Sequence, residues 1–178
     1  MKLPIAGSFT LQLGKKIREK LEVDEKSTAK PAGFLKNEFY GDWKNGLFPA
    51  ASFDSYSAEY LLAVLLTRDE TNVRWWKRIY SNEGAQIAYT IRDNYIPDFV
   101  VCDSTGRLWI VEAKAQAGEE DPNVQAKRKA TERVIRLLVG LPEFAGQQWG
   151  YVIAYESDIA TAEPFEDVVK QVRRRENT

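Results

Sequence analysis

Two acidic residues and a lysine are spaced so that one β-hairpin could bring them together. Asp98 lies just before an apolar run, residues 99–101, and Glu112 and Lys114 lie at the end of a second run, residues 109–114. Carboxylate oxygens are the ligands that Mg²⁺ and Mn²⁺ prefer, and a lysine ammonium group can offset negative charge on a phosphate. The residue types therefore predict metal-dependent chemistry on a phosphate ester, provided that the two strands pair in the matching register.

The turn between the two runs sets that register. Residues 103–107 are Asp-Ser-Thr-Gly-Arg, which is typical of a hairpin turn with glycine at a position that can take positive φ. With a loop at residues 104–106, counting back along both strands puts Asp98 directly opposite Glu112. Side chains on one face of a strand repeat every two residues, so Glu112 and Lys114 point the same way. We therefore expect two carboxylates and a lysine on one face of the hairpin.

Placing two carboxylates opposite each other costs stability. Directly opposed cross-strand Cβ atoms lie about 5 Å apart. Two full negative charges at that separation repel by about 3 kcal/mol when the effective dielectric constant is near 20. A divalent cation between them would remove this repulsion, whereas a solvent-facing hairpin with an ordinary Glu112–Lys114 surface pair is the alternative interpretation. The matching register of Asp98 favours the metal site.

These residues resemble a known motif. Pro97-Asp98 followed by Glu112-Ala113-Lys114 is similar to the signature of the PD-(D/E)XK nuclease superfamily. The resemblance implies an α/β protein with a restriction-endonuclease-like core, α-β-β-β-α-β, in which helices flank a mixed central sheet. Within the superfamily, the chain most resembles the C-terminal endonuclease domain of type III restriction enzymes, over about residues 45–156. The segments that carry this closer likeness are residues 45–48 and 51–55, the Trp75-Trp76 pair, and residues 95–99 and 106–112.

The resemblance also implies a reaction, a cofactor and partners. The reaction is hydrolysis of phosphodiester bonds in duplex DNA, leaving a 5′-phosphate, with Mg²⁺ as cofactor and Mn²⁺ as a substitute. Asp98, Glu112 and the carbonyl group of Ala113 would bind the metal, and Lys114 would orient or activate the attacking water. In type III systems such a domain follows a helicase-like translocase, and a methyltransferase subunit reads the recognition sequence.

A third acid precedes the motif on an expected helix. Residues 56–66 are apolar nearly all round, which predicts a buried helix, and Glu59 shares a face with Leu62 and Leu66. Many nucleases of this superfamily carry a helical glutamate at the metal site, and Glu59 resembles it. The alternative is a favourable charge in the first helical turn with Ser57 as the N-cap. We favour a role at the metal site and keep the alternative open.

A second helix, predicted over residues 121–140, carries most of the basic side chains near the motif. Asp121 is the expected N-cap and Pro122 the first helical residue. The expected buried stripe is Ala130, Val134, Leu137, Leu138 and Leu141. The basic residues fall on another face and are Lys127, Lys129, Arg133 and Arg136. Contact with a DNA backbone and a solvated helix face are both open for them. Gln116 follows Lys114 on its face of the strand, where it could touch a phosphate or water.

Other segments supply the rest of the expected core. Residues 71–80 predict an extended segment, residues 86–91 the first strand of the motif, and residues 148–155 a central strand. Residues 163–174 predict a closing helix. Trp75 and Trp76 suit packing better than stacking on bases.

Composition limits the chemistry and the setting. The chain has 178 residues, of which 44% are apolar and 29% charged, with a net charge of −1. It contains no histidine, which excludes His-dependent triads and His-zinc sites, and its one cysteine, Cys102, is expected to be buried in a strand. We expect one domain, residues 1–178, with residues 1–50 as an N-terminal extension packed on a nuclease core at residues 51–178. The chain lacks a signal-peptide pattern and any long apolar run, so we expect a cytoplasmic protein without a membrane partner.

The function we expect is that of a metal-dependent endonuclease domain acting on duplex DNA, as the cleavage module of a restriction or related defence system. The chain has no phosphate-binding Gly-x-x-x-x-Gly-Lys-Ser/Thr loop, so energy for translocation would come from another domain or subunit. Two alternatives stay open. One is a non-catalytic DNA-binding or assembly module on the same fold, and the other is a nuclease of transposition or repair.

Overall fold

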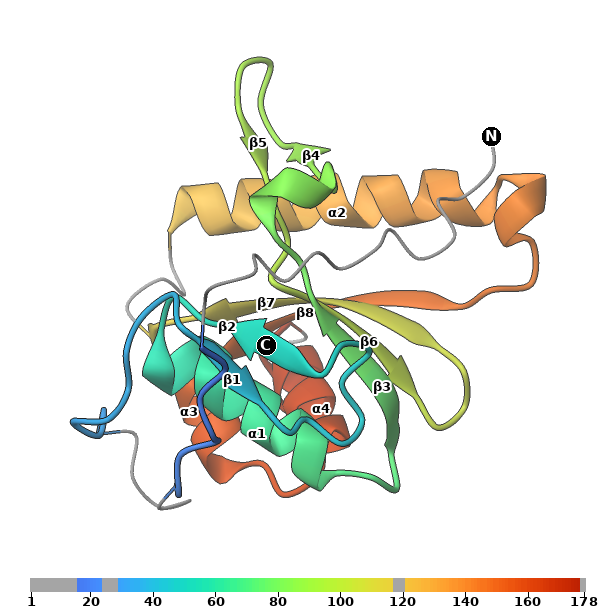
Figure 1. Ribbon diagram of the computed structural model, residues 1–178. Helices are drawn as coiled ribbons and strands as arrows, with labels where there is room; N and C mark the ends of the chain where they lie inside the picture. Colours follow the sequence, from blue (N-terminus) through green and yellow to red (C-terminus); the bar gives the residue numbers. More distant parts are fainter. Residues whose placement is uncertain (1–15, 24–28, 117–120, 177–178) are drawn as a thin grey trace.

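A four-stranded mixed sheet forms the centre of the computed structural model, which describes residues 16–23, 29–116 and 121–176 (Figure 1). The strands, in spatial order, are β3 (Val73–Arg78), β6 (Phe99–Asp103), β7 (Leu108–Lys114) and β8 (Trp149–Tyr155). Strand β6 pairs antiparallel with both β3 and β7, and β8 runs parallel to β7. The expected α/β class with a central mixed sheet is thereby confirmed.

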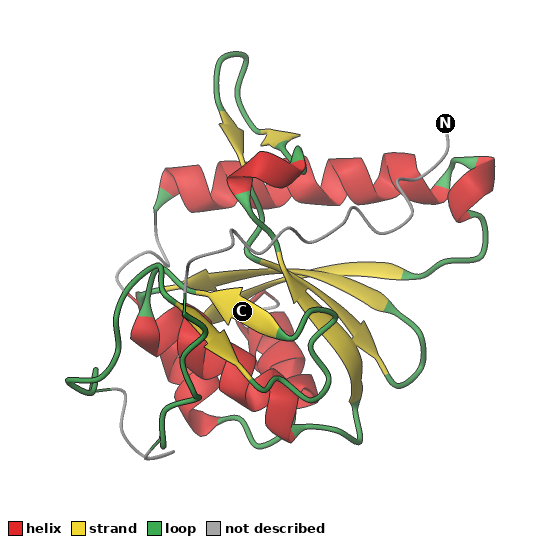
Figure 2. Cartoon of the chain, in the orientation of Figure 1, coloured by secondary structure: helices red, strands yellow, loops and turns green. Residues whose placement is uncertain are grey.

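Helices cover both faces of this sheet (Figures 1 and 2). One face carries α1 (Leu61–Arg68), α3 (Glu156–Thr161) and α4 (Phe165–Glu176), and α2 (Pro122–Val139) crosses the other. The main core lies between the sheet and the first group of helices, where Phe99, Val111 and Val152 are fully buried. A smaller cluster joins Val124 of α2 to Ile153 and Tyr155 of β8. Because both faces of the central strands are covered, β7 is apolar along most of its length.

Two small sheets stand beside the central one. Strands β1 (Phe39–Gly41) and β2 (Ala50–Ser52) pair antiparallel, as do β4 (Ile87–Ala88) and β5 (Asn94–Tyr95), whose hairpin projects beyond α2 in Figure 1. The prediction that residues 86–91 form the first strand of the motif is wrong. Only Ile87 and Ala88 pair, and Thr90 and Asp93 then close a turn. The first strand of the central sheet is β3, within the segment predicted to be extended.

Aromatic residues before the motif belong to the main core. Phe34, Tyr40 and Trp43 are buried and pack around Tyr60. The Tyr60 hydroxyl accepts a hydrogen bond of 2.8 Å from the backbone N–H of Leu21. The described part of residues 1–50 thus packs on the helix that precedes the sheet, and residues 1–15 and 24–28 lie outside the described residues. Among the two tryptophans of β3, Trp76 is buried in the core and donates to Asn45 and Thr67.

Helix α2 begins and ends within one residue of the prediction, but the residues of its expected buried stripe are only half-buried or are exposed. The Asp121 side chain caps it by accepting from the backbone N–H of Asn123 at 2.8 Å. Leu137 is 63% exposed and Leu141, just beyond the helix, 46% exposed. The buried residues of α2 are Val124 and Thr131. The apolar cluster between α2 and the sheet lies at Val124, in the first turn of the helix.

Three further observations complete the fold. Cys102 is buried in β6, as expected. The closing helix begins at Phe165 rather than 163, and the short helix α3 before it was not predicted. No helix in the described ranges combines the length and the apolar character needed to cross a membrane.

Candidate active site

The predicted hairpin register is confirmed. Phe99 pairs with Val111 and Cys102 with Leu108, and Gly106 in the turn has φ of 87°. Continuing the same register by one residue beyond the strand puts Asp98 opposite Glu112. The two strands bring these acids to one end of the sheet, where β3 also ends.

Glu112 is a buried carboxylate with polar or charged partners from three elements. It is 2% exposed, and its Oε1 lies 2.8 Å from Lys114 Nζ on the same strand and 3.6 Å from Lys127 Nζ on α2. Its Oε2 accepts a hydrogen bond of 2.9 Å from the Tyr151 hydroxyl on β8. A buried charge is costly unless it is paired and hydrogen-bonded. The packing of β7, β8 and α2 therefore fixes the position of this carboxylate.

Asp98 lies just ahead of β6 and is tied to β7 through the backbone. Its Oδ2 accepts a hydrogen bond of 2.8 Å from the N–H of Ala113, and its Oδ1 lies 3.3 Å from Nη1 of Arg78. Burial raises the pKa of Asp98 to about 6, although Arg78 opposes the shift and Ala113 donates to the carboxylate. Glu59 and Glu112 raise this pKa further. The ion pair with Arg78 is therefore too weak to offset burial and the neighbouring negative charges.

Glu59 joins the same cluster from the other face of the sheet. It lies in a turn of π-helix, Tyr56–Tyr60, ahead of α1 and is 7% exposed. The N-cap is Ser55, whose hydroxyl accepts from the Glu59 N–H at 3.0 Å, so Ser57 is not the N-cap that the alternative interpretation assumed. Glu59 Oε2 accepts from the Asp54 N–H at 2.7 Å and pairs with Arg78 at 3.0 Å. Glu59 thus makes a capping contact and also lies within the acidic cluster.

The protonation of Lys114 limits its chemistry. Burial lowers the pKa of Lys114, but the carboxylates of Glu112, Asp98 and Glu59 more than compensate, and the net shift is upward. Lys114 is therefore an ammonium ion at neutral pH. In this state it can donate hydrogen bonds and stabilise negative charge, but it cannot accept a proton from water.

Two tyrosines complete the surroundings of Glu112. Burial, and then the Glu112 charge, raise the pKa of Tyr151 well above its ordinary value, so its hydroxyl stays a neutral donor. Burial likewise raises the pKa of Tyr95 to about 12, and its hydroxyl is hydrogen-bonded to Thr131 of α2. The ammonium group of Lys127 lies 5.1 Å from the centre of the Tyr95 ring. Attraction to the ring face helps to hold Lys127 beside Glu112.

The structure brings together some of the predicted site residues and leaves others outside. Glu59, Asp98, Glu112, Lys114 and Lys127 converge at the end of the sheet. Three of the predicted basic residues are exposed on α2 and lie outside the ion pairs of this cluster, namely Lys129, Arg133 and Arg136. Gln116 is exposed beyond the end of β7 and accepts a hydrogen bond of 2.6 Å from the Ser157 hydroxyl.

Sequence analysis missed Arg78 and Tyr151. Arg78 is 8% exposed and contacts both Glu59 and Asp98, while Tyr151 contacts Glu112. A signal for Arg78 exists in the alternation of β3, because it falls on the same face as buried Trp76. A cation on a buried face requires carboxylate partners. The sequence contains no comparable signal for Tyr151, because its contact with Glu112 depends on the parallel pairing of β7 with β8.

The donor types at the site fit a small divalent cation. Mg²⁺ is usually bound by one or two carboxylates with other oxygen ligands, and Asp98, Glu112 and the Ala113 carbonyl offer that set. The negative charges of the three acids are already balanced by three basic side chains, which are Arg78, Lys114 and Lys127. Within the described ranges, no three or more Asp, Glu, His or Cys side chains are grouped so that they could hold a metal ion. A metal would therefore rest on two carboxylates and would have to compete with the basic side chains.

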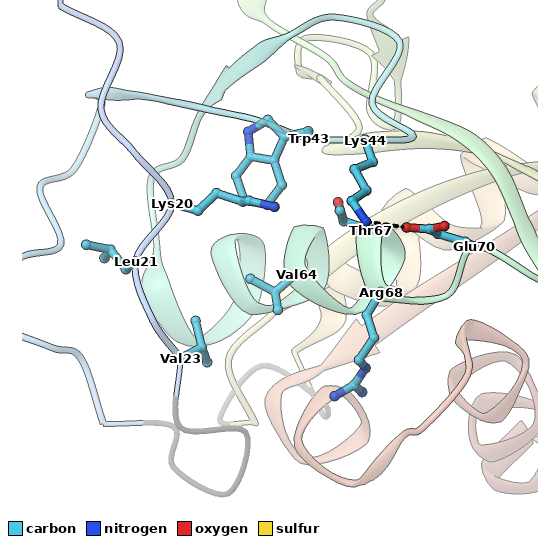
Figure 3. Close-up of a pocket in the computed structure, with 9 residues that line it drawn as sticks. All are labelled: Lys20, Leu21, Val23, Trp43, Lys44, Val64, Thr67, Arg68 and Glu70. Atoms are coloured by element: carbon cyan, nitrogen blue, oxygen red, sulfur yellow. Dashed lines mark ion pairs between the residues drawn. The ribbon is translucent and has the colours of Figure 1, made fainter.

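A cavity of about 330 Å³ lies elsewhere, between residues 20–23, the Trp43–Lys44 segment and the end of α1 (Figure 3). The ion pair between Lys44 and Glu70, 3.2 Å long, crosses its rim. Its lining residues include none of the acids of the cluster. The cavity is therefore separate from the candidate active site.

The cluster combines opposed carboxylates, a protonated lysine and buried tyrosine hydroxyls at one end of the sheet. No protein-family model, curated protein or solved structure matches the chain.

Proposed function

We propose that the chain is a metal-dependent nuclease domain that hydrolyses phosphodiester bonds in duplex DNA. The observation that carries the proposal is the assembly of Asp98, Glu112 and Lys114 in the register that such chemistry requires. The order of elements, α1-β3-β6-β7-α2-β8, supports a restriction-endonuclease-like core. Contacts from β3, β8 and α2 hold these acids at the end of the sheet.

Each residue of the cluster has a role in this proposal. Asp98, Glu112 and the carbonyl of Ala113 would hold Mg²⁺ or Mn²⁺, and the bound ion would supply Lewis-acid stabilisation of negative charge on the phosphate. Lys114, held 2.8 Å from Glu112, donates to a phosphate oxygen or orients the attacking water. Tyr151 holds the second oxygen of Glu112 and so fixes the direction of the first. These groups are in place before substrate binds, which is where such a site gains most of its effect.

Duplex DNA would approach the side of the molecule formed by α2. The net charge of −1 gives no global attraction for DNA, so binding would depend on local basic side chains. Lys129 and Arg133 lie one helical turn apart on α2 and are exposed. They are therefore candidates for contacts with backbone phosphates.

Reversing the charge of Lys129 and Arg133 together should weaken DNA binding about equally for all sequences. Phosphate contacts carry no sequence information, and each contact that is lost lowers the dependence of affinity on salt. The measurement is a titration of labelled duplexes at several salt concentrations. The matched control reverses Lys44 and Lys170, which are exposed on other parts of the surface. Unchanged affinity and salt dependence in the Lys129/Arg133 variant would identify this face of α2 as solvated.

Cleavage of supercoiled plasmid tests the proposed activity. The purified chain should nick or linearise the plasmid in Mg²⁺ or Mn²⁺ and leave it intact in excess chelator. Binding of DNA without cleavage under any of these conditions would favour the second candidate function, a non-catalytic DNA-binding or assembly module. The balance of three acids by three basic side chains favours that second candidate, because the cluster is neutral without a metal.

The biological setting we propose is restriction or a related defence system in the cytoplasm. A helicase-like translocase, as a domain or subunit, and a methyltransferase subunit would be the partners. The lack of a phosphate-binding loop in this chain is consistent with a separate source of translocation energy. A role in transposition or repair would use the same site chemistry and would differ only in the partners.

A further inference from the structure

Arg78 is a buried cation between two carboxylates. It ends strand β3, is 8% exposed, and lies between Glu59, ahead of α1, and Asp98, ahead of β6. Its Nη2 is 3.0 Å from Glu59 Oε2, and its Nη1 is 3.3 Å from Asp98 Oδ1. A charge so deeply buried needs partners to offset the loss of water. Arg78 is thus a basic group in direct contact with the Asp98 carboxylate.

The contacts of this guanidinium group are unequal. Nη1 donates to the backbone carbonyls of Asp98 at 2.8 Å and Ile79 at 3.1 Å, and the group also lies 5.3 Å from the Phe99 ring centre. Charge-assisted N–H···O bonds are usually about 2.7–2.9 Å long, so the 3.3 Å contact with the Asp98 carboxylate is the weakest of the set. The buried Nε has no hydrogen-bond partner among the described residues. Arg78 would therefore stay anchored if the Asp98 carboxylate turned away.

Glu59 is the closer of the two carboxylate partners of Arg78. Its Oε2 is shared between the guanidinium group and the backbone N–H of Asp54 at 2.7 Å. Both contacts hold the carboxylate on the α1 side of the sheet, whereas Glu112 is held on the α2 side by Tyr151 and Lys114. Asp98 lies between these halves and contacts both, through Arg78 and through the Ala113 N–H.

We propose that Arg78 is a resident counter-ion of the metal-free site, which neutralises Asp98 and releases its Oδ1 to an incoming divalent cation. This inference rests on the proposed metal-dependent function and concerns how that site is regulated. Arg78 remains held by Glu59, the two carbonyls and the Phe99 ring, and its charge lowers the affinity of the site for metal. Glu59 is then a positioning residue for Arg78 and is not a metal ligand.

Calorimetric titration of the whole chain with Mn²⁺ tests this competition. Arg78→Gln should bind Mn²⁺ at least about tenfold more tightly than the wild type, because the ion no longer faces a fixed positive charge beside Asp98. The control is Arg68→Gln, which removes the same charge from an arginine that donates to the carbonyls of Ala162 and Glu163. That control should bind Mn²⁺ like the wild type.

A double variant covers the case in which Arg78→Gln does not fold. Glu59→Gln combined with Arg78→Gln removes both charges of the pair and should also bind Mn²⁺ more tightly than the wild type. Affinity that is unchanged or lower in a folded variant, while the wild type binds Mn²⁺, would overturn the role of Arg78 and leave the proposed function standing. Absence of binding in the wild type and in both variants would instead remove the metal site, and with it both proposals.

Discussion

Lys114→Ala is expected to lower the rate of DNA cleavage by about 10²–10³-fold, which is the usual effect of removing one donor that stabilises charge in a transition state. The ammonium group lies 2.8 Å from Glu112 and its pKa is raised by the surrounding acids, so it carries a full charge where the phosphate would react. Glu112 keeps Lys127 and Tyr151 as partners in the variant. Affinity for Mn²⁺ should therefore stay the same or rise.

Single-turnover cleavage and calorimetry on the same preparations separate these effects. A loss confined to an interaction made in the transition state lowers the rate without weakening metal binding. Lys77→Ala is the matched control, because Lys77 also pairs with a glutamate, Glu83, at 2.7 Å and has a similar exposed fraction, 25% against 29%. Cleavage by Lys114→Ala at the rate of the Lys77→Ala control would show that Lys114 is structural.

Asp98→Asn is expected to stabilise the metal-free protein at neutral pH while abolishing metal binding and cleavage. The pKa of Asp98 is about 6 in the fold, above the ordinary 3.8, so the folded state holds this proton more tightly than the unfolded state. The contribution of Asp98 to stability is then full below pH 4 and is lost as the pH rises through 6. Ionisation at neutral pH costs about 3 kcal/mol by this shift.

Denaturant unfolding of wild type and Asp98→Asn between pH 4 and 8 measures this difference. The advantage of the variant should grow from near zero at pH 4 to about 1–3 kcal/mol above pH 7, all without metal. Added Mg²⁺ should raise the midpoint of the wild type and leave the variant unchanged, since only a state that binds the ion is stabilised by it. A variant that is less stable than the wild type at pH 7 would mean that the pair with Arg78 outweighs burial.

Short-range sequence patterns correctly predicted the register of the motif hairpin and the bounds of helix α2. Turn chemistry at residues 103–107 is enough to set the register that places Asp98 opposite Glu112, and it depends on no distant contact. The cap at Asp121 and the following proline likewise determine where α2 begins. The end of α2 was also predicted, because Gly140 follows the last helical residue.

The features that were predicted wrongly or missed are those that depend on contacts between segments far apart in the sequence. Residues 86–91 have the composition of a strand, but β3 occupies the place beside β6, so only a short hairpin forms there. Leu137 looks like a core residue on a helical wheel, yet it is exposed, and the apolar cluster between α2 and β8 lies at Val124. Arg78 reaches Asp98 through the pairing of β3 with β6, and Tyr151 reaches Glu112 through the parallel pairing of β7 with β8. Such pairings are set by the whole fold and are not visible in a local pattern.

The most direct test of the account compares plasmid cleavage by Glu112→Gln and Glu143→Gln in Mg²⁺ or Mn²⁺. Glu112→Gln keeps the shape of the buried side chain at the end of the sheet and removes its charge, whereas Glu143 is exposed on a short 3₁₀ helix after α2. We predict wild-type cleavage with Glu143→Gln and loss of cleavage with Glu112→Gln in a folded protein. Equal cleavage by the two variants would contradict an active site built on Asp98, Glu112 and Lys114.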